Sequence, residues 1–179
     1  VTETASGTAG SIAISDDGGT LAFTTGANLV GNGNADGNPE VFTFDLDGGT
    51  GFTQHTFSAG GVNEAVALSG DASTLAWHSN RNLVGENGDL SFEVFRRDLR
   101  VPGAVEQQWT SGVAPRASVG PALGEDGEAL AWTTDVDVAG TNPELTAEHA
   151  WSTVFGYTPI TISPATSTFG HPVALAGAG

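Results

Sequence analysis

The chain of 179 residues contains no cysteine and no lysine. Without cysteine it can form neither disulfides nor thiolate metal sites, and it has no thiol nucleophile. No stretch approaches the roughly 18 apolar residues that a membrane-spanning helix needs, so the sequence predicts no membrane insertion. The chain begins with Val1, without a basic start or an apolar signal core, which is typical of a processed or excised segment.

Positive charge is also scarce, because five arginines stand against 21 acidic residues and give a formal net charge of −16. Such a surface repels phosphate groups, so we expect no nucleic-acid partner, whereas divalent cations and basic proteins are compatible with it. The simplest interpretation of the charge is solubility in a salty or extracellular setting.

A sustained helical period is absent as well. The 26 glycines and the evenly spread apolar residues predict short strands joined by turns. An acidic, glycine-containing turn that runs into Leu-Ala-aromatic occurs three times. Its aromatic residues, which we expect to fill the space between neighbouring structural units, lie 54 and 55 residues apart, at Phe23, Trp77 and Trp132.

Two further motifs repeat with a similar period. Asn-Leu-Val-Gly occurs at 28–31 and 82–85, and Glu-Val-Phe at 40–42 and 93–95. Each unit has four strand-like segments, which in the first unit are 11–15, 20–25, 40–45 and 52–57, and the outermost one of the second unit is 105–110. Four strands in a period of this length are typical of a β-propeller blade.

The predicted fold class is therefore all-β, with propeller blades that are each a four-stranded antiparallel sheet, in a partial or open propeller. Residues 11–62, 63–117 and 118–170 form the three predicted blades. Residues 1–10 are interpreted as the outer strand of a preceding blade and 171–179 as the inner strand of a following one. Three blades do not close a ring of four to eight. Either the chain is a section of a longer one, which we favour, or its open edges pair with other copies or partners.

These motifs resemble the TolB-type, WD-like β-propeller repeats of bacterial periplasmic and secreted proteins. The resemblance covers residues 11 to about 110 well and 118–169 partially. It implies the fold and a periplasmic or extracellular location. It does not imply an activity, because members of the family serve as docking surfaces, enzyme-associated domains and parts of envelope assemblies.

The loop between the second and third predicted strands of the first blade is a candidate calcium site. Oxygen-bearing side chains alternate along it, and Gly37 allows the chain to fold back around a cation; they are Asn32, Asn34, Asp36, Asn38 and Glu40. The spacing resembles the calcium loops of integrin-type propellers. Only two of the five residues are charged, so we expect weak binding, and a turn that needs no ion is the alternative.

Catalytic motifs do not emerge from the remaining polar residues. The histidines, which we expect at the surface or between blades, lack metal-ligand spacing, and there is no G-x-S-x-G elbow; they are His55, His78, His149 and His171. The repeated turn acids are predicted to accept backbone N–H bonds; they are Asp16, Asp17, Asp71 and Asp126. The only basic cluster is expected to meet nearby carboxylates, which we favour, or an acidic patch on a partner; it consists of Arg96, Arg97 and Arg100.

The sequence thus predicts a non-enzymatic interaction or structural module, an extracytoplasmic propeller segment. We expect it to contact protein partners, further copies or the remainder of the same propeller through open blade edges. Two alternatives are the propeller domain of a secreted hydrolase that acts on glycans or peptides, and a calcium-stabilised adhesin-like repeat.

Overall fold

The structure, a computed structural model, describes residues 7–49, 51–138, 140, 144–145, 147–153 and 156–157. These residues contain no helix, and therefore none that could span a membrane. Their twelve strands are β1 (Ala9–Ile14), β2 (Thr20–Thr25), β3 (Glu40–Asp45), β4 (Phe52–Gln54), β5 (Asn63–Leu68), β6 (Thr74–Ser79), β7 (Glu93–Asp98), β8 (Gln107–Gln108), β9 (Ser118–Leu123), β10 (Ala129–Thr134), β11 (Glu148–Thr153) and β12 (Gly156–Tyr157).

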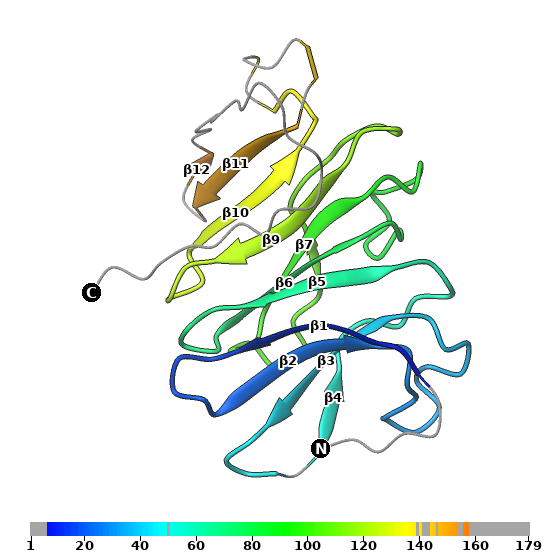
Figure 1. Cartoon of the computed structure of the whole chain (residues 1–179), viewed down its shortest axis with the longest axis vertical. Helices are drawn as coiled ribbons and strands as arrows, with labels where there is room; N and C mark the ends of the chain where they lie inside the picture. Colours follow the sequence, from blue (N-terminus) through cyan, green and yellow to red (C-terminus); the bar gives the residue numbers. More distant parts are fainter. Residues whose placement is uncertain are drawn as a thin grey trace.

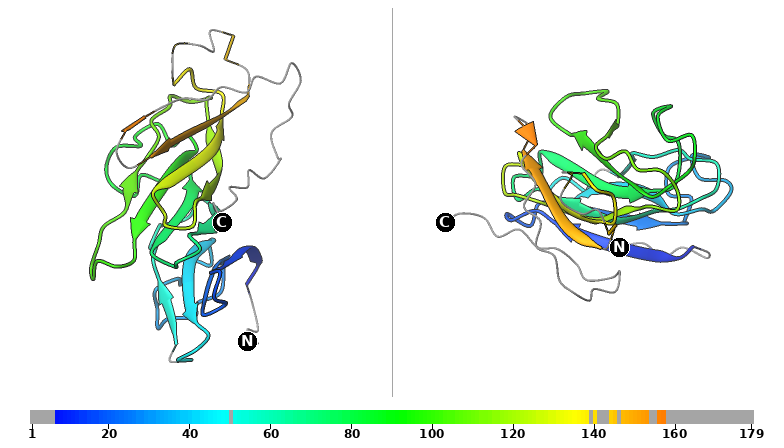
Figure 2. Two further views of the ribbon diagram at one scale, coloured as in Figure 1. Left: turned by 90° about the vertical axis from the view of Figure 1, so that its left-hand side faces the viewer. Right: turned by 90° about the horizontal axis from the view of Figure 1, so that it is seen from above.

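The strands form three antiparallel sheets whose strand order follows the sequence: β1–β4, β5–β8 and β9–β12, which we call blades 1, 2 and 3. The blades follow one another along the long axis of the molecule, with blade 1 at one end and blade 3 at the other (Figures 1 and 2). Their first strands lie side by side, β1 against β5 and β5 against β9. The predicted all-β, partial propeller is confirmed.

Each blade has two faces, which differ in the size of their side chains. We call the face that bears Leu21 and Phe23, and their counterparts in later blades, the leading face, and the face that bears Ala22 and Val41 the trailing face. Neighbouring residues of a strand point to opposite faces, so the repeated Leu-Ala-aromatic motif places large side chains on one face and alanine on the other.

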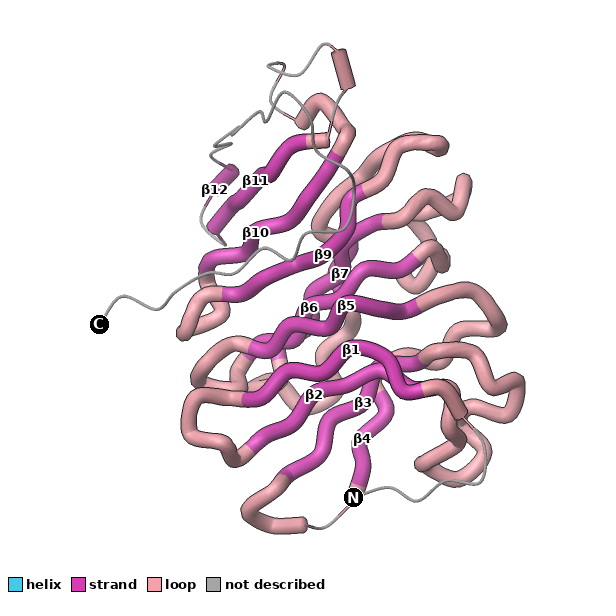
Figure 3. The backbone as a smooth tube through the Cα atoms, in the orientation of Figure 1, coloured by secondary structure: helices cyan, strands magenta, loops and turns pink. Residues whose placement is uncertain are grey.

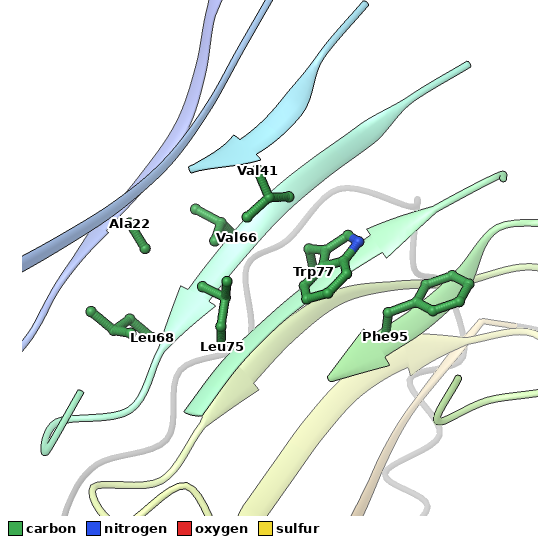
Figure 4. Packing of buried hydrophobic residues seen from close by; sticks show 7 residues of the cluster. All are labelled: Ala22, Val41, Val66, Leu68, Leu75, Trp77 and Phe95. Atoms are coloured by element: carbon green, nitrogen blue, oxygen red, sulfur yellow. The ribbon is translucent and has the colours of Figure 1, made fainter. Parts of the chain in front are cut away.

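Large leading faces pack onto small trailing faces. Leu75, Trp77 and Phe95 of blade 2 are fully buried against Ala22 and Val41 of blade 1 (Figure 4). Blade 3 repeats this contact, because its leading residues pack against the trailing face of blade 2; the residues are Leu130 and Trp132 against Ala76 and Val94. The predicted interblade positions of Trp77 and Trp132 are confirmed.

The turns that open each blade also join the blades. The Asp16 amide donates to the Gly70 carbonyl, and the Asp71 amide donates to the Glu125 carbonyl, both at 2.9 Å. The side chains of three of the four predicted turn acids accept backbone N–H bonds; the pairs are Asp17 with Gly19, Asp71 with Ser73 and Asp126 with Glu128. Asp16 takes part through its backbone amide. The acids of the repeat are therefore part of the scaffold.

The outer strands are shorter than predicted, since segments 52–57 and 105–110 are reduced to β4 and β8. A threonine hydroxyl explains the early end in each case. The Val41 amide donates to Thr56 Oγ1 and the Val94 amide to Thr110 Oγ1, both at 2.8 Å, so a side chain takes the place of a backbone acceptor. At the ends of the chain, β1 begins at Ala9, and the predicted strands within 1–6 and 171–179 lie outside the described residues.

Candidate functional site

The predicted calcium loop connects β2 to β3 on the side of the molecule where the long loops gather, to the right in Figure 3. Its five oxygen-bearing residues are not all brought together. Asn32 and Asp36 are exposed, whereas Asn34, Asn38 and Glu40 are buried. Asp36 Oδ2 accepts a hydrogen bond from the Gly60 amide at 2.7 Å, which ties the loop to the β4–β5 connection.

Glu40 is the centre of this region. It is fully buried, and its Oε1 accepts bonds from the Ser58 amide (2.7 Å), the Ser58 hydroxyl (2.9 Å) and Asn38 Nδ2 (2.9 Å). Its Oε2 accepts from Asn63 Nδ2 of β5 at 3.1 Å. Burial raises the pKa of Glu40, while the hydrogen bonds from Thr56, Asn38 and Ser58 oppose that rise. The Glu40 carboxylate therefore holds together the β2–β3 loop, the β4–β5 connection and β5, the first strand of blade 2. We call this arrangement the glutamate clamp.

Blade 2 contains the same clamp. Glu93 is fully buried and accepts bonds from the Gly112 amide (2.6 Å), the Ser91 hydroxyl (2.8 Å) and the Thr110 hydroxyl (2.5 Å). Asp89, like Asp36, accepts from a backbone amide of the following connection, that of Ala114, at 2.7 Å. The repeated Glu-Val-Phe motif is therefore a buried hydrogen-bonding device. This role was not predicted from the sequence, although a threonine follows each motif at a similar distance, at 56 and 110.

Blade 3 has a buried glutamate at the equivalent position, Glu148. Glu148 is 3% exposed, and burial followed by the charge of Asp137 raises its pKa. Its Oε1 has no hydrogen-bond partner among the described residues.

Three buried asparagine oxygens lie unpaired near the Glu40 clamp, two in the β2–β3 loop and one at the start of β5. The Oδ1 atoms of Asn34, Asn38 and Asn63 are buried and have no hydrogen-bond partner among the described residues. Their Nδ2 atoms all donate, so the amides cannot be flipped without loss. Buried acceptors of this kind attract a water molecule or a cation. Asn63 was not part of the predicted set because it lies in the next blade.

The second candidate site is the leading face of blade 1. It lines a cavity of about 430 Å³, and none of the lining residues is charged; they are Ala9, Gly10, Ser11, Ile12, Leu21, Phe23, Thr24, Thr25, Ala27, Leu29, Phe44, Leu46 and Phe52. Phe52 contacts Phe23 edge-on, with 6.0 Å between ring centroids, and Phe44 at 4.9 Å. Ile14 on the same strand as Ile12 is 55% exposed. Phe23 was expected between blades, and no described blade covers it.

Two histidines, the buried His55 and the half-buried His78, contact neighbouring strands and blades. Burial, with a smaller contribution from Arg97, lowers the pKa of His55 to about 4, and its Nε2 lies 2.8 Å from Thr43 Oγ1. Burial also lowers the pKa of His78 to about 4, and its Nδ1 accepts from the Gly120 amide of blade 3 at 3.2 Å. In the described part of the chain, no three His, Asp or Glu side chains are grouped closely enough to hold a metal.

The arginine cluster follows the prediction in two of its three members. Arg97 pairs with Glu106 at 2.6 Å and Arg100 with Asp98 at 2.9 Å. Arg96 instead lies over the Trp109 ring, 5.5 Å from its centroid, and donates to the Gly127 carbonyl at 3.2 Å. It therefore joins blade 2 to blade 3.

Comparisons with solved structures support the fold. TolB from Acinetobacter baumannii superposes with a TM-score of 0.59 and 20% identity over 88% of this chain and 33% of that one. The fold is that of a TolB-type β-propeller. A protein assigned as TolB from Agrobacterium tumefaciens gives a TM-score of 0.57 and 17% identity over 89% of this chain and 50% of that one.

A prolyl endopeptidase also resembles this TolB-type propeller, with a TM-score of 0.56 and 13% identity over 92% of this chain and 23% of that one. The chain thus spans between about a quarter and a half of these three structures. No protein-family model and no curated protein matches its sequence. At these identities the likeness concerns the fold, and function must come from the chain's own residues.

Proposed function

We propose that the chain is a non-enzymatic interaction and structural module of an extracytoplasmic, TolB-like propeller, and that it contacts protein through the leading face of blade 1. The observation that supports this proposal is the absence of charge from that face. The chain has 21 acidic residues, yet none lines the cavity. An exposed apolar patch with a polar surround is typical of a protein-binding surface.

Cysteine labelling tests the proposal, because the chain has no thiol of its own. Phe23→Cys should react quickly with a maleimide in the isolated chain and slowly in native extracts of the source cells, where the partner covers the face. Val105→Cys is the control, since Val105 is 74% exposed and lies away from the cavity, and it should react equally in both samples. Equal labelling of Phe23→Cys in both samples would refute the proposal.

The proposed location is the periplasm or the cell exterior, as in the proteins that the repeats resemble. The scarcity of basic residues suits a surface that meets solvent and basic proteins rather than nucleic acid. Fractionation of source cells tests it, and recovery of the chain in the cytosol alone would contradict it.

The competing function is that of a propeller domain in a hydrolase acting on peptides or glycans. The fold likeness to a prolyl endopeptidase supports this alternative. If the chain is such a domain, it should hydrolyse members of a panel of peptides or oligosaccharides. A single substitution of a carboxylate, serine or histidine residue should then abolish that hydrolysis. Under our proposal the purified chain leaves every member of the panel intact.

We also propose a weak calcium site in the β2–β3 loop. The unpaired Oδ1 atoms of Asn34, Asn38 and Asn63 support it, because hard oxygen donors are the ligands that calcium prefers. The nearby Glu40 is occupied by protein donors, so it contributes charge rather than a free ligand. Calcium should raise the unfolding midpoint and a chelator should lower it, and equal midpoints would count against the site.

A further inference from the structure

A second cavity, of about 330 Å³, lies where the loops of blades 1 and 2 meet. Its walls are residues 55–59 of the β4–β5 connection and residues 81–83 and 90 of the β6–β7 connection, and Glu106 completes them. None of these residues lines the cavity on the leading face of blade 1. The two cavities are therefore separate candidate sites.

Arg81 gives this cavity a positive charge that no neighbour neutralises. Three of the other four arginines form ion pairs, and Arg96 lies over the Trp109 ring. The Arg81 guanidinium has neither a hydrogen bond nor an ion pair within the described ranges. The carboxylate of Glu106, which also lines the cavity, is paired with Arg97 at 2.6 Å. Arg81 is thus left to bind the anionic group of a ligand.

Two further hydrogen-bond donors border the cavity. His55 is 5% exposed, and its Nδ1 has no hydrogen-bond partner among the described residues. Burial holds the pKa of His55 at about 4, so its ring is neutral at neutral pH. The single ring proton lies on Nδ1 when the Thr43 hydroxyl, 2.8 Å from Nε2, is the donor. Asn82 accepts from the Asn87 amide through Oδ1, which leaves its Nδ2 to donate to a ligand.

The remaining wall is apolar and open to solvent. Phe57 is 68% exposed and Leu90 is 46% exposed. Leu90 has a φ of +59°, a left-handed conformation that is unfavourable for a residue with a Cβ. Leucine recurs in this conformation at Leu145 of blade 3, whereas blade 1 has Gly37 there, with a φ of +72°. Because glycine is sufficient for this turn, the Leu90 side chain is available for an apolar contact with a ligand.

The equivalent place between blades 2 and 3 lacks these side chains. Val136 is the counterpart of Arg81, since the amide of each donates to a hydroxyl two residues before it. Ser111 is the counterpart of Phe57, since each follows a threonine whose hydroxyl accepts from a valine amide. Two blades can therefore join without an arginine or a phenylalanine at these positions, so blade packing does not explain Arg81 and Phe57.

The charge of the whole chain narrows the choice of ligand. A net charge of −16 repels a small free anion, so a ligand that brings a carboxylate to Arg81 needs positive charge elsewhere. A neighbouring surface hollow shares Glu106 with the cavity and is also lined by Glu86. Basic groups outside the cavity would meet this acidic surface. A basic chain that ends in a large apolar residue combines all three features.

We propose that this cavity binds the C-terminal residue of a basic protein. The terminal carboxylate accepts hydrogen bonds from Arg81, and the last side chain packs against Phe57 and Leu90. Basic residues that precede it in the partner lie near Glu86. This site is separate from the leading face of blade 1, and its occupant is recognised by charge as well as by apolar contact.

Fluorescence polarisation with the full chain tests the proposal. The probe is a labelled peptide, Lys-Gly-Lys-Gly-Ser-Phe, with a free C-terminus. The same peptide as a C-terminal amide should bind at least about tenfold more weakly, because Arg81 loses its charged acceptor. A peptide with glutamate in place of both lysines should bind at least about fivefold more weakly. Phenylpropionate, which has the carboxylate and the ring alone, should displace the probe only at about 100 times the concentration of unlabelled peptide.

Matched variants assign the contacts. Arg81→Gln should weaken binding of the free-acid peptide about tenfold and leave binding of the amide unchanged. Arg100→Gln is the control, because it removes the same charge from an exposed side chain outside the cavity, and it should change neither affinity by more than about twofold. Leu90→Gly should weaken both peptides about threefold or more, while its melting temperature stays within about 2 °C of the wild type, because glycine suits the left-handed turn.

Three results would overturn the proposal. One is equal affinity of the wild-type chain for the free acid and the amide, which includes the case in which neither binds at a chain concentration of about 1 mM. Another is undiminished binding of the free acid in both Arg81→Gln and Leu90→Gly; if Arg81→Gln fails to fold, Leu90→Gly and the comparison of acid with amide decide. The third is displacement by phenylpropionate at the same concentration as by unlabelled peptide, because the occupant would then be a small organic acid. Labelling of Phe23→Cys is independent of all three.

Discussion

Blade 1 and blade 2 share four strands, an acidic turn, a stacked aromatic pair and a buried glutamate clamp, yet they differ in two respects. The leading face of blade 2 is buried and that of blade 1 is open. In the clamp of blade 2 the Ser91 hydroxyl donates to Asn87 Oδ1 at 3.2 Å. Blade 1 has Asn38 in place of this serine, and the Oδ1 atoms of Asn34 and Asn38 have no hydrogen-bond partner among the described residues. A motif therefore determines how a blade is built, and the neighbouring surface determines what its residues do.

The largest difference should appear at the two aromatic residues. Trp77→Ala should reduce the free energy of unfolding by about 3–5 kcal/mol, because it removes a fully buried ring between blades. Phe23→Ala should cost about 1–2 kcal/mol, since solvent already reaches one side of that ring. Urea denaturation followed by circular dichroism measures both, and equal losses would show that the open face is covered in solution.

Substitution of the clamp glutamates in blades 1 and 2 should have different effects on amide exchange. Glu93→Gln and Glu40→Gln should each cost about 2–3 kcal/mol, because buried donors lose a charged acceptor. Glu40 also holds Asn63, so only Glu40→Gln should speed amide exchange at the start of β5. Glu64→Gln is the control, because Glu64 is exposed on the same strand. If amide exchange at the start of β5 is unchanged or slower in Glu40→Gln, Glu40 does not stabilise the contact between the two blades.

Acid should weaken both blades through His55 and His78. The folded-state pKa values of His55 and His78 are about 4, below the ordinary 6.5, so the unfolded chain takes up protons first as the pH falls. The contribution of these histidines to the free energy of unfolding is therefore complete above pH 6.5. It is lost as the pH falls from 6.5 to about 4, by roughly 2 kcal/mol or more per histidine. His55→Gln should flatten the unfolding free energy over that range. If the dependence of the unfolding free energy on pH is the same in His55→Gln as in the wild type, His55 is accessible to solvent in the folded chain.

The smallest effect concerns calcium. At ten times its dissociation constant, calcium should add about 1.4 kcal/mol to the stability of the wild-type chain, or a few degrees in melting temperature. Asn38→Ser, which introduces the residue that blade 2 has at the equivalent position, should lose that response. It removes Asn38 Oδ1, and its hydroxyl should donate to Asn34 Oδ1 as Ser91 Oγ donates to Asn87 Oδ1. Magnesium serves as the control ion. A response that survives in Asn38→Ser would place the cation elsewhere.

Much of the fold could be predicted because its causes are local. Spacing of Phe23, Trp77 and Trp132 indicated the blade period, and the turn acids follow from the ability of aspartate to accept nearby backbone N–H bonds. The ends of β4 and β8 could not be predicted in this way, since they depend on a threonine hydroxyl meeting a valine amide from the neighbouring strand. Arg96 is similar, because its partner Gly127 lies in the next blade.

The sequence by itself determined the blade period, the alternation of large and small faces and the scaffold role of the turn acids. The period follows from motifs that recur 54 and 55 residues apart, and the other two depend on residues a few positions apart. Only the tertiary structure decided the rest. It joined Asn63 to Glu40 across two blades, divided the predicted calcium loop into exposed and buried residues, and buried Trp77 between blades while no described blade covers Phe23. The physical reason is that hydrogen bonding and burial depend on which surface lies opposite, and sequence spacing within one blade contains no information on its neighbour.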